Sequence, residues 1–277
     1  MAPVDPHYLW AFGHGIMLLS AAYVLLQTVF FRPTPTKTYK LAYTGALLSY
    51  SIVVYKSLGR PQVNQAWLRR ALVDENVQYA ILALYWWVAK PVNVSILPFA
   101  TFSLFHCLTF LRTNIIPKFV PAQPPAAQGA APRQPALLEN ISRKIQLWVK
   151  SNYDVAMRFV AYCELLICVR LILGVLTFRS SFIAPLFMVH FVRLRYHASP
   201  FTRSAVGNVV IYINNFVSSK PAAVQNVWST IKRVISSWGG VPLFGPGTQG
   251  QGATQPQQAA GPGAAGQTAA GSGAGRR

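Results

Sequence analysis

The stretch from Val77 to Leu111 constrains the fold more than any other, because Lys90 is its only formal charge. Its second part, from Asn93 onward, carries no charge and is long enough for a helix to cross a hydrocarbon core about 30 Å thick. Apolar residues cover every side of that helix, whereas a helix at the surface of a soluble protein has one apolar stripe. The stretch therefore predicts helices buried all round, either by lipid or, as a hairpin, by a large soluble core.

The stretch is interrupted once, at Lys90 and Pro91. Tyr85, Trp86 and Trp87 stand beside this break, and aromatic side chains of this kind favour the boundary between membrane and water. We therefore expect either two crossings, or one helix packed at the interface followed by one crossing.

Two adjacent acids, Asp74 and Glu75, precede the stretch. Neighbours on a helix diverge by about 100°, so these carboxylates do not form a catalytic pair. We expect them to pair with Arg70 or to begin the helix that carries Tyr79, where negative charge is favourable.

Other segments favour lipid over a soluble core. Tyr8 to Phe31 carries no formal charge and has aromatic residues at both ends. Because Asp5 stands where a signal peptide would be basic, we expect a retained anchor rather than a cleaved signal. Small residues such as Gly13 and Gly15 offer a face for a neighbouring helix, and we interpret His14 as neutral and hydrogen-bonded. Leu41 to Leu58 is a weaker, amphipathic second span.

The charge balance points to an anionic partner surface. The chain has 25 Lys and Arg against 6 Asp and Glu, a formal net charge of +19. Nucleic acid and anionic lipid are the two candidates, and lipid is the simpler one for a chain with apolar spans. We expect a preference for anionic lipid and no nucleic-acid partner. Part of the excess also fits the placement of basic residues at span ends.

The C-terminal half begins with a predicted helix over Leu137 to Asn152, followed by an apolar run from Phe159 to Phe178. That run contains Glu164 and Arg170, which do not share a helical face and are costly at the middle of a bilayer. The apolar segment from Ser181 to Val192 is too short to cross alone. Residues 159–192 therefore form either a span packed in a bundle or a hairpin in one leaflet.

Two amphipathic helices follow, each opened by a proline, at Pro200 and Pro221. The second keeps apolar residues at i, i+3 and i+4 and carries basic side chains on its polar face, a pattern typical of an interfacial helix. The alternative is a helix packed on protein. The predicted membrane-surface residues are Val209, Val210, Ile213 and Phe216 in the first helix, and Val224, Val227, Trp228, Ile231, Lys232, Arg233, Val234, Ile235 and Trp238 in the second.

These segments predict an all-α, polytopic integral membrane protein. The expected units are an N-terminal transmembrane unit (1–118), a Pro/Ala/Gln linker (119–136), a membrane-associated helical unit (137–198), the amphipathic helix pair (199–238) and a disordered Gly/Ala-rich tail (239–277).

Signatures of catalysis are missing from the sequence. It has no glycine-rich phosphate loop after a strand, no zinc-ligand spacing and no nucleophile elbow. Its three cysteines, Cys107, Cys163 and Cys168, suggest neither a disulfide framework nor a metal site. We expect no enzyme, and no catalytic, cofactor or metal residues.

The segment from Leu72, LVDENVQYAILALYW, and the following KPVNVSILPFATFSLFHCLT resemble the transmembrane-protein-thirty-three family, whose fungal members are pore-membrane and peri-nuclear endoplasmic reticulum proteins. The similarity covers roughly residues 8 to 238. The matching motif residues are Asp74, Tyr79, Pro91, Ser95, Pro98, Ser103 and His106.

The resemblance implies a multi-spanning protein of the endoplasmic reticulum and nuclear envelope. It also implies a link to reticulon-type tubule shaping and nuclear pore distribution, without catalytic residues. We expect reticulon-type membrane proteins, nuclear pore subunits or a nuclear transport receptor as protein partners.

Two alternatives of other classes stay open. One is a transporter or channel that uses His14, His106 and Glu164 inside the membrane. The other is an adaptor that recruits a soluble partner through its C-terminal helices, with Trp228 and Trp238 as the contact residues.

Overall fold

The computed structural model describes residues 5–62, 64–119, 137–178 and 181–240, and within these ranges the regular structure is entirely helical. The predicted linker and tail lie outside them, apart from Phe119, Gly239 and Gly240, as does the side chain of Trp238. The helices are α1 (Pro6–Val29), α2 (Thr36–Leu58), α3 (Gln65–Val73), α4 (Glu75–Val88), the 3₁₀ turn η1 (Asn93–Ser95), α5 (Ile96–Phe110), the π-helix η2 (Leu111–Ile115), α6 (Ile116–Phe119), α7 (Leu137–Leu176), α8 (Ile183–Ala198), α9 (Pro200–Ser218) and α10 (Ala222–Gly239).

Helix α1 begins where the sequence favours a helix start. Asp5 is its N-cap and accepts a 2.8 Å hydrogen bond from the His7 amide, and Pro6 occupies the first turn, where a missing amide hydrogen costs nothing. The helix ends at Val29, so it matches the predicted first span.

Helices α1 and α2 pack at very short range. A Cβ added to Gly45 would lie 2.5 Å from the carbonyl oxygen of Gly13, so the two backbones touch where neither residue has a side chain. The Ser49 hydroxyl donates a 2.8 Å hydrogen bond to the carbonyl of Trp10 at the same crossing. The predicted small-residue contact is therefore real at Gly13, whereas Gly15 has open space around it.

The predicted break at Lys90 and Pro91 is present. Helix α4 ends at Val88, and Ala89 and Val92 have extended backbone angles before η1 begins. At its other end, the Asp74 carboxylate caps α4 by accepting hydrogen bonds of 2.8 and 3.0 Å from the amides of Asn76 and Val77, as expected for an acid at a helix start.

Three segments of the described chain are long and apolar enough to cross a membrane: Pro6–Val29, Asn93–Phe119 and Leu137–Leu176. Helices α2 and α4, which the sequence suggested as further crossings, do not meet this criterion. Between 33% and 44% of the most apolar part of each candidate span is buried, so large apolar side chains such as Leu19 and Leu166 face outward. An outward apolar surface of this extent favours lipid over the soluble-hairpin alternative.

The largest departure from the sequence prediction is α7. The sequence suggested a helix over Leu137 to Asn152 and a separate apolar run from Phe159, but a single 40-residue helix covers both. No proline or glycine stands between Asn152 and Phe159 to interrupt the backbone hydrogen bonds. At about 1.5 Å per residue this helix is about 60 Å long, which is twice the thickness of a hydrocarbon core. Its length leaves room for a crossing of the bilayer and for a further segment outside the hydrocarbon.

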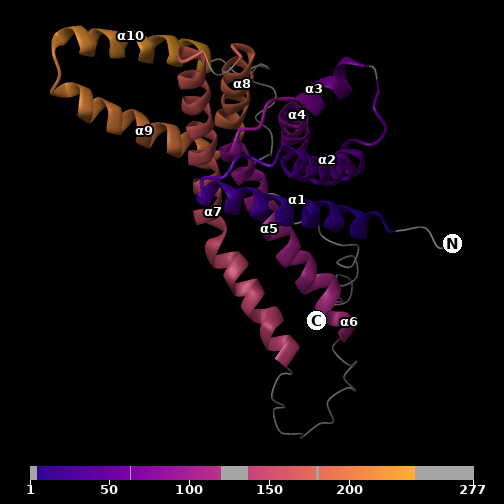
Figure 1. Cartoon of the computed structure of the whole chain (residues 1–277). Helices are drawn as coiled ribbons and strands as arrows, with labels where there is room; N and C mark the ends of the chain where they lie inside the picture. The colour runs from indigo at the N-terminus through magenta and orange to yellow at the C-terminus, as the bar shows by residue number, and fades with distance from the viewer. Residues whose placement is uncertain (1–4, 63, 120–136, 179–180, 241–277) are drawn as a thin grey trace, which may run out of the picture.

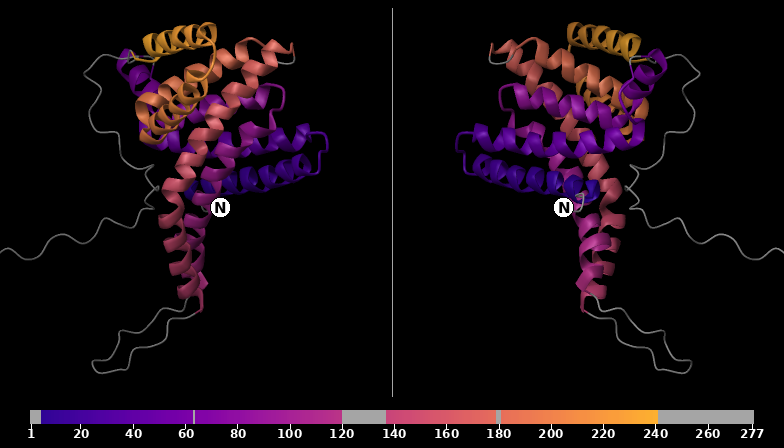
Figure 2. Two further views of the ribbon diagram at one scale, coloured as in Figure 1. Left: turned by 90° about the vertical axis from the view of Figure 1, so that its left-hand side faces the viewer. Right: turned by 90° about the vertical axis from the view of Figure 1, so that its right-hand side faces the viewer.

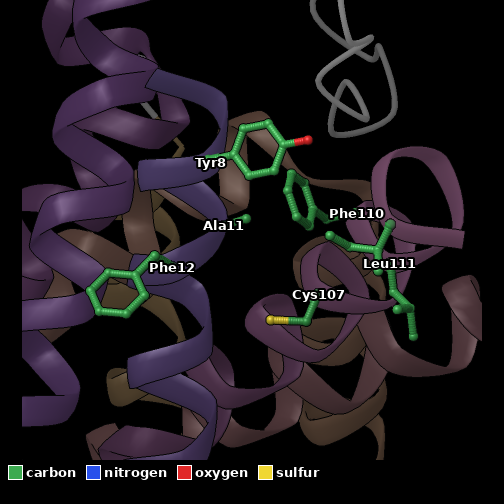
Figure 3. A pocket seen from close by; sticks show the side chains of 7 residues that line it. Tyr8, Ala11, Phe12, Cys107, Phe110 and Leu111 are labelled. Carbon is green, nitrogen blue, oxygen red and sulfur yellow. The ribbon is translucent and has the colours of Figure 1, made fainter. Parts of the chain in front are cut away.

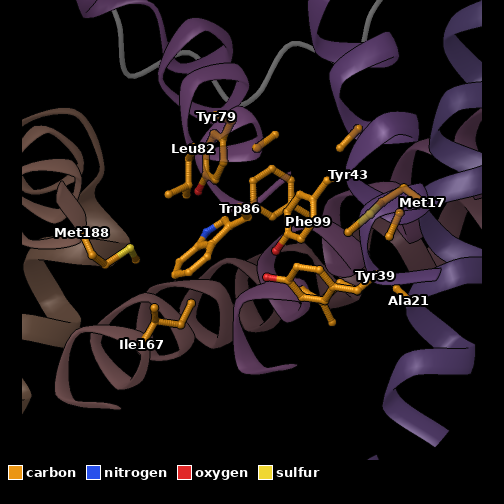
Figure 4. Close-up of a cluster of buried hydrophobic side chains, with 14 of the residues drawn as sticks. Met17, Ala21, Tyr39, Tyr43, Tyr79, Leu82, Trp86, Phe99, Ile167 and Met188 are labelled. Carbon is orange, nitrogen blue, oxygen red and sulfur yellow. The ribbon is translucent and has the colours of Figure 1, made fainter. Parts of the chain in front are cut away.

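The helices form a layered body from which two elements project (Figures 1 and 2). Helices α5 and α7 run side by side away from the body, while α9 and α10 form a hairpin at another edge. The core lies where α1, α2, α4, α5, α7 and α8 meet, and Figure 4 shows its large side chains converging from these helices. Its largest fully buried members include Trp86, Tyr39, Tyr43, Phe99 and Met188.

Candidate membrane-surface helix and buried polar cluster

The apolar face of α10 is free in the structure. Val224, Val227, Ile231, Val234 and Ile235 are between 43% and 62% exposed, and none of the described side chains of α10 is buried. Arg233 is exposed on the same helix. A helix with a bare apolar stripe and basic side chains beside it has the composition of an interfacial helix.

Trp228 does not lie with the exposed apolar residues. It is half-buried against α9, where its indole Nε1 donates a 2.7 Å hydrogen bond to Oδ1 of Asn214. The Lys232 ammonium donates to the same oxygen at 3.0 Å and lies 5.9 Å from the Trp228 ring centroid. We call Asn214, Trp228 and Lys232 the α9–α10 clasp. Through this clasp Trp228 and Lys232 both contact α9, and both side chains are half-buried.

The predicted surface residues of α9 have mixed environments. Val209, Val210 and Ile213 are half-buried, and only Phe216 is exposed, with the Lys220 ammonium 4.6 Å from its ring centroid. Helix α9 packs on α7 and α8, burying Ala205 and Val217. The structure therefore places the free apolar surface on α10, with α9 as its support.

Four residues of the family motif are buried (Tyr79, Ser95, Pro98 and Ser103), and the other three are half-buried (Asp74, Pro91 and His106). The Ser95 hydroxyl is 2.7 Å from the hydroxyl oxygens of both Tyr39 and Tyr43, which fixes η1 against α2. Pro98 is buried in the first turns of α5, where a proline is tolerated, and Pro91 is half-buried in the break.

Ser103 and His106 from the motif meet α1. The Ser103 hydroxyl lies 3.0 Å from Nδ1 of the buried His14, and the ring centroids of His14 and His106 are 4.5 Å apart. Trp10 contacts both histidines edge-on. The expected hydrogen-bonded state of His14 is thus present, with a serine from α5 as its partner.

A buried polar cluster joins α4, α7 and α8. Glu164 on α7 is fully buried; its Oε1 accepts a hydrogen bond from the Tyr79 hydroxyl and lies 3.8 Å from Nε of Arg195. Nη1 of Arg195 lies 2.8 Å from a carboxylate oxygen of Glu75, and its guanidinium carbon is 5.3 Å from the Tyr79 ring centroid. The partner of Glu75 is thus Arg195 rather than Arg70, while the alternative expectation, that the two acids begin the helix that carries Tyr79, is confirmed.

The charge of Arg195 is maintained by its neighbours. Burial lowers the pKa of the guanidinium, but Tyr79, Glu164 and Glu75 raise that pKa by more, so it ends above its usual value. The buried carboxylate of Glu164 therefore faces a permanent positive charge. Sequence reasoning missed this pair because it compared Glu164 only with Arg170 on the same helix, whereas the partner lies on α8.

The groups named for a transporter fall into two sites. His14 and His106 lie together between α1 and α5, while Glu164 is held by Tyr79 and Arg195. Tyr50 stands between the two sites, 6.1 Å from the ring of His14 and 5.9 Å from that of Tyr79. In the described residues no three His, Cys, Asp or Glu side chains are grouped to hold a metal ion, and the three cysteines are free thiols.

Comparison with known proteins gives one family over most of the chain. The family described as Transmembrane protein 33/Nucleoporin POM33 matches residues 6–240. The chain is 30% identical over 246 residues to Tetra-spanning protein 1 of Schizosaccharomyces pombe, covering 86% of each protein. It is 32% identical over 237 residues to Nucleoporin POM33 of Chaetomium thermophilum, covering 81% of this chain and 83% of the relative. Transmembrane protein 33 of Homo sapiens is 23% identical over 186 residues, 66% of this chain and 68% of its own. No solved structure matches.

Proposed function

This chain belongs to the Transmembrane protein 33/Nucleoporin POM33 family, and from that premise we propose that it organises the membrane of the endoplasmic reticulum and nuclear envelope, including the membrane around nuclear pores. Relatives named nucleoporin and pore membrane protein support a role at the nuclear pore, and the candidate spans support a location in the membrane. The proposed role is structural, without an enzymatic step.

The observation that carries this proposal is the bare apolar face of α10 on a body anchored in lipid. Moving apolar area out of water is favourable by about 25 cal/mol per Å², so five exposed aliphatic side chains supply a driving force toward the bilayer surface. Basic residues such as Arg233 and Lys220 add about 1 kcal/mol each beside anionic lipid. Anionic lipid is therefore the first partner that we propose.

The mechanism is an asymmetry between the leaflets. Helix α10 has 18 residues and is about 27 Å long. When such a helix lies in the surface plane, its apolar face enters only about 5–10 Å. It then adds area to one leaflet and not to the other, which favours curvature toward that side. The spanning helices keep α10 at the membrane, so insertion needs no separate recruitment.

Reconstitution of the full chain into liposomes tests the proposal. Wild-type protein should shift vesicles that contain phosphatidylserine toward smaller diameters in cryo-electron microscopy. Replacing Val227 and Ile231 by Asp should abolish the shift, because two charges then face the hydrocarbon. The control Ser229→Asp with Thr230→Asp adds the same charge to exposed polar positions and should keep most of the effect. Equal diameters for all three proteins would reject the proposal.

Protein partners form a second part of the proposal. Reticulon-type membrane proteins, nuclear pore subunits and a nuclear transport receptor are the classes that we propose for a member of this family. The adaptor alternative would use the same exposed α10 face for a soluble protein. That alternative is favoured if wild-type protein in detergent captures a soluble partner and the Val227→Asp, Ile231→Asp variant does not. The two proteins must at the same time give vesicles of equal diameter.

A further inference from the structure

An apolar pocket lies between the start of α1 and the end of α5 (Figure 3). Its volume is about 320 Å³, and it is lined by Tyr8, Ala11, Phe12, Cys107, Phe110, Leu111 and Ile115. The tyrosine hydroxyl and the cysteine thiol are the only polar side-chain groups in this lining. The pocket is separate from the buried polar cluster and from α10.

The pocket has a local structural origin. The start of α1 lies beside the end of α5, where the ring centroids of Tyr8 and Phe110 are 5.3 Å apart. At the same place the chain changes from α-helix to the π-helix η2, which contributes Leu111 and Ile115 to the wall. Short π-helical segments are rare and occur frequently at functional sites. The pocket therefore lies where the backbone departs from a regular α-helix.

The rim of the pocket is polar and basic. The Lys118 ammonium lies 4.6 Å from the centroid of the Tyr8 ring, and Nδ2 of Asn114 is 3.2 Å from Nε2 of His7. The acid at this end, Asp5, caps α1 through the His7 amide. Because two candidate spans begin and end here, the rim lies at the boundary between hydrocarbon and headgroups.

We propose that this pocket binds one acyl chain of an anionic glycerophospholipid, with Lys118 beside its headgroup. An ordered water needs two to four polar partners, which the lining does not offer, so an apolar occupant suits it better. Phe12, which also contributes to the lining, is 62% exposed on the outward surface of α1. The basic rim complements an anionic headgroup, since cations next to a bilayer favour acidic lipid.

The test uses the full chain in nanodiscs that contain a trace of phosphatidylserine with a photoreactive group near the end of one acyl chain. A phosphatidylcholine with the same chain is the second probe. After illumination, mass spectrometry should locate the adducts within residues 8–12 and 107–115. We expect the serine lipid to label this site about fivefold more than the choline lipid, which corresponds to one cation beside an anionic headgroup.

Variants make the site assignment specific. Ala11→Trp and Cys107→Phe each fill the pocket from one wall and should remove most of the adduct. Leu19→Trp, at an outward position of the same helix, is the matched control and should leave the adduct unchanged. Lys118→Gln should keep acyl labelling but remove the preference for serine lipid.

Two results would overturn the proposal. One is labelling spread evenly over outward positions such as Leu19 and Leu166, which would indicate only the annular lipid shell. The other is unchanged labelling in folded Ala11→Trp and Cys107→Phe proteins, with folding judged by a single symmetric elution peak. The α10 variant Val227→Asp, Ile231→Asp should retain the adduct, which keeps this test independent of the proposed curvature role.

Discussion

The phenolic oxygen of Tyr79 on α4 lies 2.5 Å from Oε1 of Glu164 on α7, and its hydroxyl donates to that carboxylate. This bond joins a residue of the family motif to an acid in the apolar half of the longest helix. Arg195 on α8 adds the opposite charge. Three helices that are distant in sequence are thus held by one buried polar cluster, and its disruption should loosen the body that carries α9 and α10.

Arg195→Met should destabilise the protein strongly. It leaves the Glu164 carboxylate buried without a countercharge, which typically costs about 3–5 kcal/mol and should lower the apparent melting temperature in detergent by more than about 5 °C. The double variant Glu164→Gln, Arg195→Met should recover part of the loss, because the amide is neutral and still accepts from Tyr79. Arg170→Gln, an exposed position on α7, is the control. A melting temperature of Arg195→Met equal to wild type would contradict the structural role of the cluster.

The close approach of α1 and α2 predicts a sharp difference between two neighbouring glycines. A Cβ on Gly13 would lie 2.3 Å from Oγ of Ser49, so Gly13→Ala must push the helices apart and should cost about 1–3 kcal/mol. Gly15→Ala meets no atom within 4 Å and should be neutral or stabilising by about 0.5–1 kcal/mol, because alanine favours a helix over glycine. Thermal unfolding in detergent measures both, and equal effects would show that the backbones do not touch there.

The α9–α10 clasp predicts how firmly α10 is held. Asn214→Leu removes the acceptor for both Trp228 and Lys232 and should broaden the separation of the two helices. Nitroxide labels at the exposed positions Ser204 and Ser237 report that separation by double electron–electron resonance. Asn214→Asp keeps the acceptor and should preserve a narrow distribution. Asn215→Leu, at an exposed neighbouring position on α9, should also leave the distance distribution narrow. A distribution that is broadened by Asn215→Leu and not by Asn214→Leu would refute the clasp.

The features that sequence predicted well depend on short stretches of chain. A charge-free run fixes α1, Lys90 and Pro91 fix the break after α4, and Asp74 marks the start of α4 through its own cap. Each of these signals acts within a few residues, so neither the position of other helices nor the bilayer is needed to read it. The family could be predicted for the same reason, because its motif lies within one such stretch. The match of the family over residues 6–240 confirms that prediction.

The features that sequence missed are contacts between helices. Helical periodicity compares Glu164 with residues on its own helix, and the partner Arg195 is on α8. The hydrogen bond from the Trp228 indole to Asn214 on α9 is likewise a contact between helices that periodicity along α10 does not predict. The boundary placed inside α7 failed because a change in polarity was taken for a helix end, although the backbone continues without a break.

The most direct measurement of the central account is the immersion depth of α10 in the full chain. Nitroxides placed singly at Val227, Ile231, Ser229 and Thr230 of reconstituted protein, in a Cys107→Ser background, report depth through their accessibility to oxygen. We predict that labels at Val227 and Ile231 lie below the headgroups of vesicles containing phosphatidylserine, while those at Ser229 and Thr230 remain in water. Equal accessibility to oxygen at all four positions would contradict the account, because α10 would then not be inserted.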